Sequence, residues 1–130
     1  MPKVYCLLNH ELTEKQIAEL KMEFNCEEIV YPTEDVKNIW SQISTSKILD
    51  KEIISKITTW LQTAKKDDVL IVQGEFGSTF MIVDYALKNG LIPVHAVTKR
   101  IAKETREGEI VHRAYVFEHV CFRKYEYFRK

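Results

Sequence analysis

The sequence predicts an α/β domain in which helices cover both faces of a largely parallel sheet. Short apolar runs without polar alternation recur along the chain, as in central strands that are buried on both faces. Amphipathic segments separate these runs, and such alternation calls for parallel strands joined by right-handed crossovers. The 130 residues, 45% of them hydrophobic, suit one domain with a substantial core, which we assign to residues 1–130.

The expected elements follow the chain in a regular order. The predicted strands are short apolar runs and comprise residues 4–8, 28–31, 69–73 and 92–98. The predicted helices carry apolar residues at helical spacing and comprise residues 13–25, 33–43, 49–65 and 78–88. A capping box of Thr13 and Gln16 begins the first helix, and Asn89 with Gly90 ends the last one. Residues 109–117 and 119–128 alternate and are aromatic, so we expect them to add a β pair at one edge of the sheet.

Two loops are expected to meet at one point of this sheet. If the first strand pairs with the second on one side and with strand 69–73 on the other, the direction of the chain reverses between them. Ligands bind at such a switch point. The loops that open there are residues 9–13 and 74–79, the two stretches richest in small polar side chains. This coincidence is the main evidence in the residues themselves for a binding site.

The turn Gly74 to Thr79 suits an anion, because free N–H groups at a helix start and close-approaching glycines favour phosphate. It matches neither GxGxxG nor GxxxxGK[ST], so the sequence does not support ATP or dinucleotide binding. A tight structural turn explains the glycines equally well. His10 is either a general acid or base or a surface group, and Thr98 with Arg100 either faces the same rim or is simply solvated.

No carboxylate pair, metal-ligand cluster or Ser/His/Asp order stands out, so we expect no metal and no cofactor. Phosphodiester cleavage without a metal stays open. In RNA, the ribose 2′-hydroxyl is the nucleophile, and the enzyme only has to hold it in line and stabilise developing charge. Hydroxyl, imidazole and cationic side chains are sufficient for that task.

The charge distribution limits the partners. The formal net charge of zero argues against a binder of long DNA or RNA, which needs a basic face. Residues 99–130 nevertheless carry a net charge of +4 and residues 1–98 one of −4, which fits either a solvated surface or a pocket for a small anion. Three cysteines without CxxC spacing predict neither disulfides nor a zinc site. No signal segment or membrane span is visible, so we expect a cytoplasmic protein.

Three segments carry a resemblance to a known family. They are LLNHELTEKQ (7–16), VLIVQGEFGSTFMIVDYALKNGLIPVHAVTKR (69–100) and VFEHVCFRKYEYF (116–128). They resemble small CRISPR-associated ring nucleases with a CARF-like Rossmann fold. The resemblance implies a homodimer that binds cyclic oligoadenylate, with cyclic tetra-adenylate favoured, and linearises it, which switches off type III CRISPR antiviral signalling.

The resemblance also assigns residues to roles. It implies ligand contacts from the two loops, the next strand and the closing HVxFRxY motif, namely Asn9, Gly74, Phe76, Gly77, Thr98, His119 and Arg123. It implies catalytic roles for His10, Ser78, Thr79 and Arg100. The family often has a basic residue where this chain has Cys121, so the sequence argues against a phosphate contact there.

Two alternatives to a ring nuclease stay open. One is a CARF-like module that binds the ring without cutting it, and the other is a structural partner of a larger complex. A sensor is normally fused to an effector domain, for which 130 residues leave no room. We therefore expect an enzyme, or a sponge that sequesters the ring.

Overall fold

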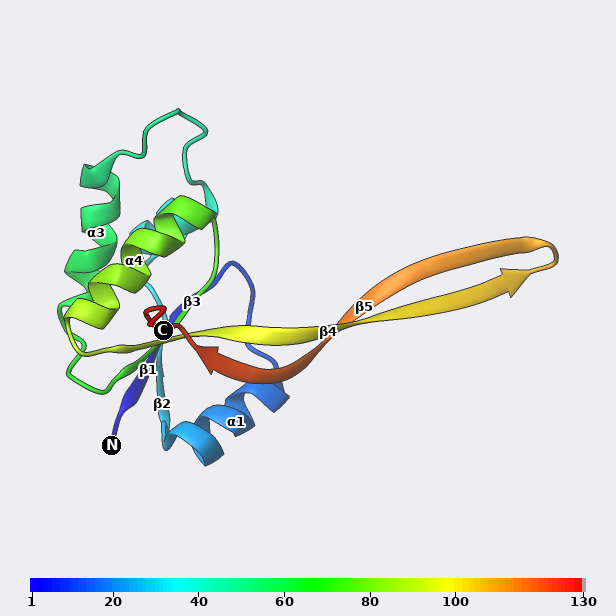
Figure 1. Ribbon diagram of the computed structural model, residues 1–130, viewed down its shortest axis with the longest axis horizontal. Helices are drawn as coiled ribbons and strands as arrows, with labels where there is room; N and C mark the ends of the chain where they lie inside the picture. Colours follow the sequence, from blue (N-terminus) through cyan, green and yellow to red (C-terminus); the bar gives the residue numbers. More distant parts are fainter. Residues whose placement is uncertain (130) are drawn as a thin grey trace.

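The computed structural model describes residues 1–129 and has five strands and four helices in that range (Figure 1). In chain order these elements are β1 (Lys3–Leu7), α1 (Glu14–Phe24), β2 (Glu28–Val30), α2 (Glu34–Ser41), α3 (Lys51–Leu61), β3 (Val69–Val72), α4 (Phe76–Lys88), β4 (Ile92–Glu107) and β5 (Ile110–Lys124). They form one sheet of order β2-β1-β3-β4-β5. The first four strands are parallel, and β5 is antiparallel to β4. The prediction of a mixed α/β fold with a largely parallel sheet is confirmed.

The helices begin where side-chain oxygens can satisfy their free N–H groups. Thr13 and Gln16 form the predicted capping box of α1, and Thr33 caps α2. Asp50 accepts a hydrogen bond from the N–H of Glu52 and so fixes the start of α3. This helix is shorter than the predicted 49–65 segment, since it begins after its cap and ends at Leu61.

Two apolar layers lie on the two faces of the sheet. Side chains of α2, α3 and α4 pack on one face against Tyr5, Leu7, Leu70 and Val72. On the other face, Leu20 of α1 is part of a smaller cluster. The prediction of helices on both faces is therefore confirmed, with α1 alone on its side (Figure 1). Each fully buried aliphatic side chain contributes roughly 1.5–3 kcal/mol to the free energy of unfolding.

The cysteines add no covalent link. Cys6 and Cys26 are buried, Cys121 is half-buried, and all three are free. Burial raises the pKa of the Cys6 thiol to about 12, which keeps it protonated and unreactive at neutral pH.

The C-terminal third differs from the prediction. Residues 109–117 and 119–128 do not form two strands. Residues 110–124 form one strand, β5, which pairs with β4 at the edge of the sheet as expected, and residues 125–128 follow it. β4 in turn continues to Glu107 instead of ending at Thr98. Charged residues alternate with apolar ones on both faces of this ribbon, so no buried face marks its strands in the sequence.

The distal part of this ribbon leaves the body as a two-stranded hairpin, which we call the arm (residues 98–118; Figure 1). A register shift between Val97 and Thr98 marks its base. At its tip, Gly108 has φ of +64°, a value that type II′ hairpin turns require at their first central position. The arm is exposed except for Ile101, which is half-buried.

The base of β5 is held against α1 by one carboxylate. Oε1 of Glu19 lies 2.6 Å from Nε2 of His119, and Oε2 accepts a 2.7 Å hydrogen bond from the N–H of Phe122. The other ring nitrogen of His119 lies 3.3 Å from the side-chain amide nitrogen of Gln16. His119 is only 7% exposed, so these contacts satisfy both of its ring nitrogens in the interior.

No helix within residues 1–129 has the length and apolar character that crossing a bilayer requires.

The Glu19 contacts generate a stability prediction. Glu19→Ala leaves the Phe122 N–H and the His119 ring without partners where water cannot replace them, so the free energy of unfolding should fall by about 1–3 kcal/mol. Urea unfolding followed by circular dichroism measures this. Glu23→Ala, one turn further along α1 and exposed, is the matched control. Equal stability of the two variants would contradict the role given to Glu19.

Candidate functional site

The predicted switch point is present in the sheet. β1 lies between β2 and β3, and Leu7 at the end of β1 is in register with Val72 at the end of β3. The loops after these two strands, residues 8–13 and 73–75, therefore follow neighbouring strand ends. Both lie on the side of the body from which the arm leaves (Figure 1). We call this side the C-terminal edge.

Gln73 ties the second loop to both neighbouring strands. Its N–H donates to the carbonyl of Leu7 at 3.3 Å, and its side-chain oxygen accepts from the N–H of Ala96 at 2.7 Å. Its own carbonyl accepts a 2.9 Å hydrogen bond from the indole of Trp40. The path from β3 to α4 is thus fixed by contacts from β1, β4 and α2.

The start of α4 already holds a negative group. The carboxylate of Glu75 accepts hydrogen bonds from the N–H groups of Gly77 at 2.9 Å and Ser78 at 2.8 Å. These two donors hold the pKa of Glu75 below its usual value. Glu75 is exposed, so its side chain can move away. A phosphate at this helix start would have to displace it.

The two hydroxyls of the turn are both buried and differ in hydrogen bonding. Ser78 is 0% exposed, and its Oγ donates to the carbonyl of Glu75 at 3.2 Å. A ligand can reach this hydroxyl only if the turn opens. Thr79 Oγ1 is buried and, within residues 1–129, makes no hydrogen bond. The Thr79 hydroxyl is therefore unpaired, but a ligand can reach it, like that of Ser78, only if the turn opens.

Packing accounts for Gly74 of the turn and constrains Gly77 less strictly. A Cβ atom at Gly74 would lie 2.7 Å from the Cε2 and Cζ2 atoms of Trp40. At Gly77 it would lie 3.0 Å from Leu49 Cδ1. The Trp40 ring explains Gly74 without a phosphate, whereas the flexible end of the Leu49 side chain can move aside and does not by itself require glycine at position 77.

His10 lies on the first loop beside a cavity of about 570 Å³. Asn9, Tyr31 and Lys37 are among the other residues that line it. His10 is exposed, and its Nδ1 lies 3.3 Å from the carbonyl of Glu11. The cavity lies between the loop after β1 and the segment from β2 to α2, away from Ser78. The imidazole is free to contact a ligand in it.

Phe76 and Arg100 are further accessible candidates. Phe76, the first residue of α4, is 92% exposed. Thr98 and Arg100 lie on the exposed base of the arm, where the Arg100 guanidinium is 4.2 Å from the ring centroid of Tyr115. An exposed aromatic ring and a guanidinium are groups that stack on nucleobases and bind phosphate.

His119 and Arg123 of the closing HVxFRxY motif lie on β5, away from the two loops. His119 is buried against α1, as described above, and reaches no ligand in this conformation. Arg123 is exposed and pairs across the ribbon with His95, whose ring lies 4.7 Å from that of Tyr125. The partners of His119, namely Gln16 and Glu19, lie about a hundred residues away in the sequence. No local pattern could have revealed them.

Exposed carboxylates outnumber lysines at the helix starts of the C-terminal edge, where Lys15, Lys37 and Lys51 also lie. Parallel strands place every helix start at this edge, and acidic residues lie at or near each start. These exposed residues are Glu11, Glu14, Glu34, Asp35, Asp50, Glu52 and Glu75. Among residues 1–129, no three His, Cys, Asp or Glu side chains come together as a metal site. A polyanionic ligand at this edge needs cations from elsewhere.

Fold and site thus define a small mixed α/β protein with a five-stranded, mostly parallel sheet and two polar loops at its switch point. The chain belongs to the family described as the Uncharacterized protein MJ1673 family, whose model matches residues 2–123. It is similar to Uncharacterized protein MJ1673 of Methanocaldococcus jannaschii. The two are 34% identical over 127 residues, which cover 96% of this chain and 98% of that protein. No solved structure matches the chain.

The packing role of Gly74 is testable. Gly74→Ala forces a methyl group against Trp40, so the free energy of unfolding should fall by about 1–3 kcal/mol. Thermal and urea unfolding measure the loss. In a Trp40→Phe background, the smaller ring should make the same change cost less, and a double-mutant cycle gives the difference. An equal cost in both backgrounds would rule out the Trp40 contact as its cause.

The Glu75 cap predicts a pH dependence. A carboxyl group whose pKa is lower in the folded state stabilises the fold above its unfolded pKa, and this contribution disappears as the pH falls through the folded pKa. The parent should therefore exceed Glu75→Ala in stability above about pH 5, and the gap should close below about pH 4. Urea unfolding across this range measures the gap. Glu126→Ala, at an exposed position after β5, should show no such gap.

Proposed function

We propose that this chain binds a cyclic oligoadenylate, cyclic tetra-adenylate in first place, and linearises it in the cytoplasm without a metal. The observation that carries the proposal is that two polar loops follow neighbouring strand ends at the switch point, and that exposed His10 of the first loop lies beside a cavity of about 570 Å³. The proposal includes a CARF-like, Rossmann-like identity for the sheet. The order β2-β1-β3-β4 of parallel strands supports this identity.

The accessible side chains have suitable chemistry. Asn9 and His10 belong to the loop after β1, where they can donate to phosphate oxygens. Phe76 offers a free ring face for an adenine, and base–aromatic stacking contributes about 1–3 kcal/mol per base. Arg100 supplies a permanent positive charge. Ser78 is enclosed by the Glu75 turn, so His10 and Arg100 are the stronger candidates for catalysis.

The proposed reaction needs no group beyond these. A ribose 2′-oxygen attacks the adjacent phosphorus, a 2′-O–P bond forms, and the P–O5′ bond breaks. The 2′-hydroxyl proton passes to a general base, and the 5′-oxygen leaves as a hydroxyl after it gains a proton. The products carry a 2′,3′-cyclic phosphate and a 5′-hydroxyl. His10 is the proposed base, and Arg100 is proposed to stabilise charge on the phosphate.

A binding module that does not cut is the second candidate function. Two observations favour it over the enzyme. The carboxylate of Glu75 occupies the N–H groups at the start of α4, and the hydroxyl of Ser78 is enclosed. A protein with only His10 and Arg100 available could hold the ring tightly and release it intact, as a sponge does.

One experiment separates these functions. The pure protein is incubated with labelled cyclic tetra-adenylate in EDTA, and the products are identified by mass spectrometry. We expect linear products with a 2′,3′-cyclic phosphate. His10→Ala should slow single-turnover cleavage at least about tenfold, because a positioned general base is worth roughly 10² to 10⁴ in rate. Glu23→Ala, which changes an exposed residue of α1 outside the lining of the cavity beside His10, should cut at the parental rate.

Other outcomes have definite meanings. Tight binding of an intact ring would support the binding module in place of the enzyme. Products with only 5′-phosphates would contradict 2′-hydroxyl attack. No binding of rings of four or six adenylates, measured by isothermal titration calorimetry, would remove the ligand assignment itself.

A further inference from the structure

We propose that the arm grips a second copy of this chain, so that two copies exchange arms across a two-fold axis and their C-terminal edges face each other. The dimer itself is inferred from the arm and the body alone. Its role in ligand binding rests on the proposed function, since the arm of one copy would then supply cations to the site of the other.

The arm exposes more apolar surface than a free hairpin tolerates. Phe117 is 69% exposed, Ile110 is 60% exposed, and Val111, Tyr115 and Val116 are also exposed. All five belong to β5, which is the edge strand of the sheet. An isolated two-stranded hairpin is only marginally stable in water, and a long apolar edge strand is a site for pairing with another chain. The arm is therefore suited to a partner that covers these side chains, and the body offers exposed aromatic rings of its own in Phe76 and Phe80 of α4.

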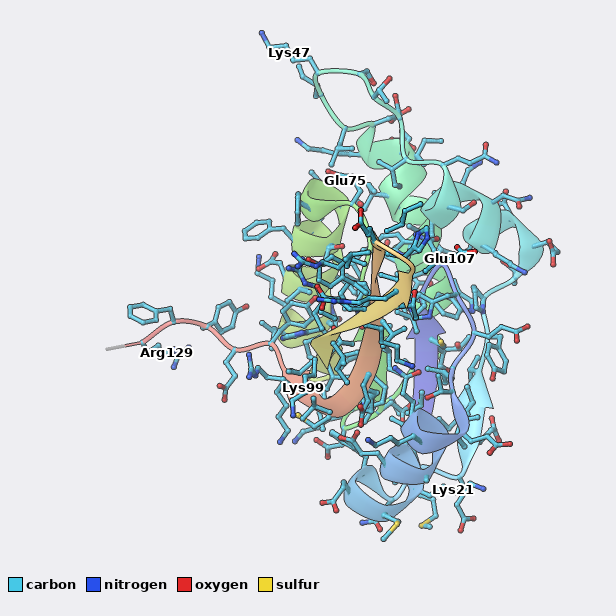
Figure 2. All side chains as sticks on the ribbon, turned by 90° about the vertical axis from the view of Figure 1, so that its right-hand side faces the viewer. Lys21, Lys47, Glu75, Lys99, Glu107 and Arg129 are labelled. Atoms are coloured by element: carbon cyan, nitrogen blue, oxygen red, sulfur yellow. The ribbon has the colours of Figure 1, made fainter. Side chains whose placement is uncertain are left out.

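The direction of the arm decides where that partner lies. β4 is parallel to β3, so its extension leaves the sheet at the C-terminal edge, where the loops after β1 and β3 also lie. In Figure 2 the arm points toward the viewer, with Lys99 near its base and Glu107 near its tip. A copy bound along the arm thus covers this edge, and symmetry places the two edges opposite each other.

Charge complementarity favours a second copy over another partner. Of the four acidic residues of the arm, Glu104 and Glu118 form ion pairs with Arg113 and Lys15, Glu107 contacts His112, and Glu109 lies at the tip. Four cations of β4 in the arm form no such ion pair within the described residues. They are Lys99, Arg100, Lys103 and Arg106. The C-terminal edge of the body carries the opposite charge, in the seven carboxylates named above. The arm points away from its own edge (Figure 1), so a second copy can present that acidic edge to it.

The area is also sufficient for a stable dimer. At about 3.4 Å per residue, residues 98–107 span roughly 34 Å, and two strands make a ribbon about 10 Å wide. One face of the arm thus covers roughly 340 Å² and hides a similar area on the partner. Two symmetric contacts bury about 1,400 Å² in total, within the roughly 1,200–2,000 Å² of stable interfaces.

Light scattering on the full chain after gel filtration tests the inference. The parent should have twice the mass of one chain at micromolar concentration. Tyr115→Lys/Phe117→Lys, which places two charges among the exposed apolar residues of β5, should be monomeric. The matched control is Tyr127→Lys/Phe128→Lys, which changes two exposed aromatic residues after β5 and should remain dimeric. Circular dichroism checks that each variant is folded.

A second variant guards against a folding defect. An Asn-Gly turn that joins Ile101 directly to Val116, its partner in the ribbon, shortens the arm and should also give a monomer. A monomeric parent at 100 μM would overturn the inference, and so would dimers of both arm variants. A parent that is monomeric and loses binding to a single-stranded RNA in the arm variants would assign the arm to RNA instead, which also overturns it.

Ring binding separates this inference from the proposed function. Dimers that depend on the arm but bind no cyclic tetra-adenylate would support the arm exchange and contradict the proposed ligand. Ring binding by a monomeric parent would contradict the arm exchange and support the proposed ligand. If both proposals hold, the arm variants should lose at least about tenfold in ring affinity, because the cations of the partner's arm are then absent from the site.

Discussion

Burial of β3 on both faces is the constraint on which the rest of the structure depends. All four of its residues, Val69 to Val72, are at most 2% exposed. Burial of both faces requires helices on each side of the sheet, and helices on each side require crossovers between parallel strands. Parallel strands in turn bring the loops after β1 and β3 to one edge. The candidate site is thus a consequence of the way the central strand is buried.

The sequence was informative wherever burial leaves a regular pattern. Unbroken apolar runs predicted the four parallel strands, and the Thr13–Gln16 capping box predicted the start of α1, because both signals are local. Strands at 92–98 and within 109–128 were predicted, but their union into one long hairpin of β4 and β5 was not, since the exposed extension of β4 has no buried face and its Lys, Arg and Glu residues resemble a loop. For the same reason, residues 99–107 did not read as a strand.

The parts of the site that escaped prediction depend on distant contacts. The need for glycine at position 74 comes from Trp40, which lies on α2. The burial of His119 comes from Gln16 and Glu19 on α1. The capping carboxylate of Glu75 is local, and an acidic residue directly before a helix start was the signal that could have revealed it. Gly74 and Gly77 beside it favoured the interpretation as a phosphate-binding turn instead.

The two-stranded form of the arm has a consequence for how this family can vary. Side chains alternate between the faces of a strand, so an arm keeps its faces when each strand gains or loses residues in twos. Each such step changes its reach by about 7 Å. The register shift at Val97 and Thr98 separates the arm from the buried part of the ribbon. The length of the arm can therefore change among relatives without a change in the packing of the core. Relatives could therefore set the spacing between two bodies, and with it the size of the space enclosed, through hairpin length alone.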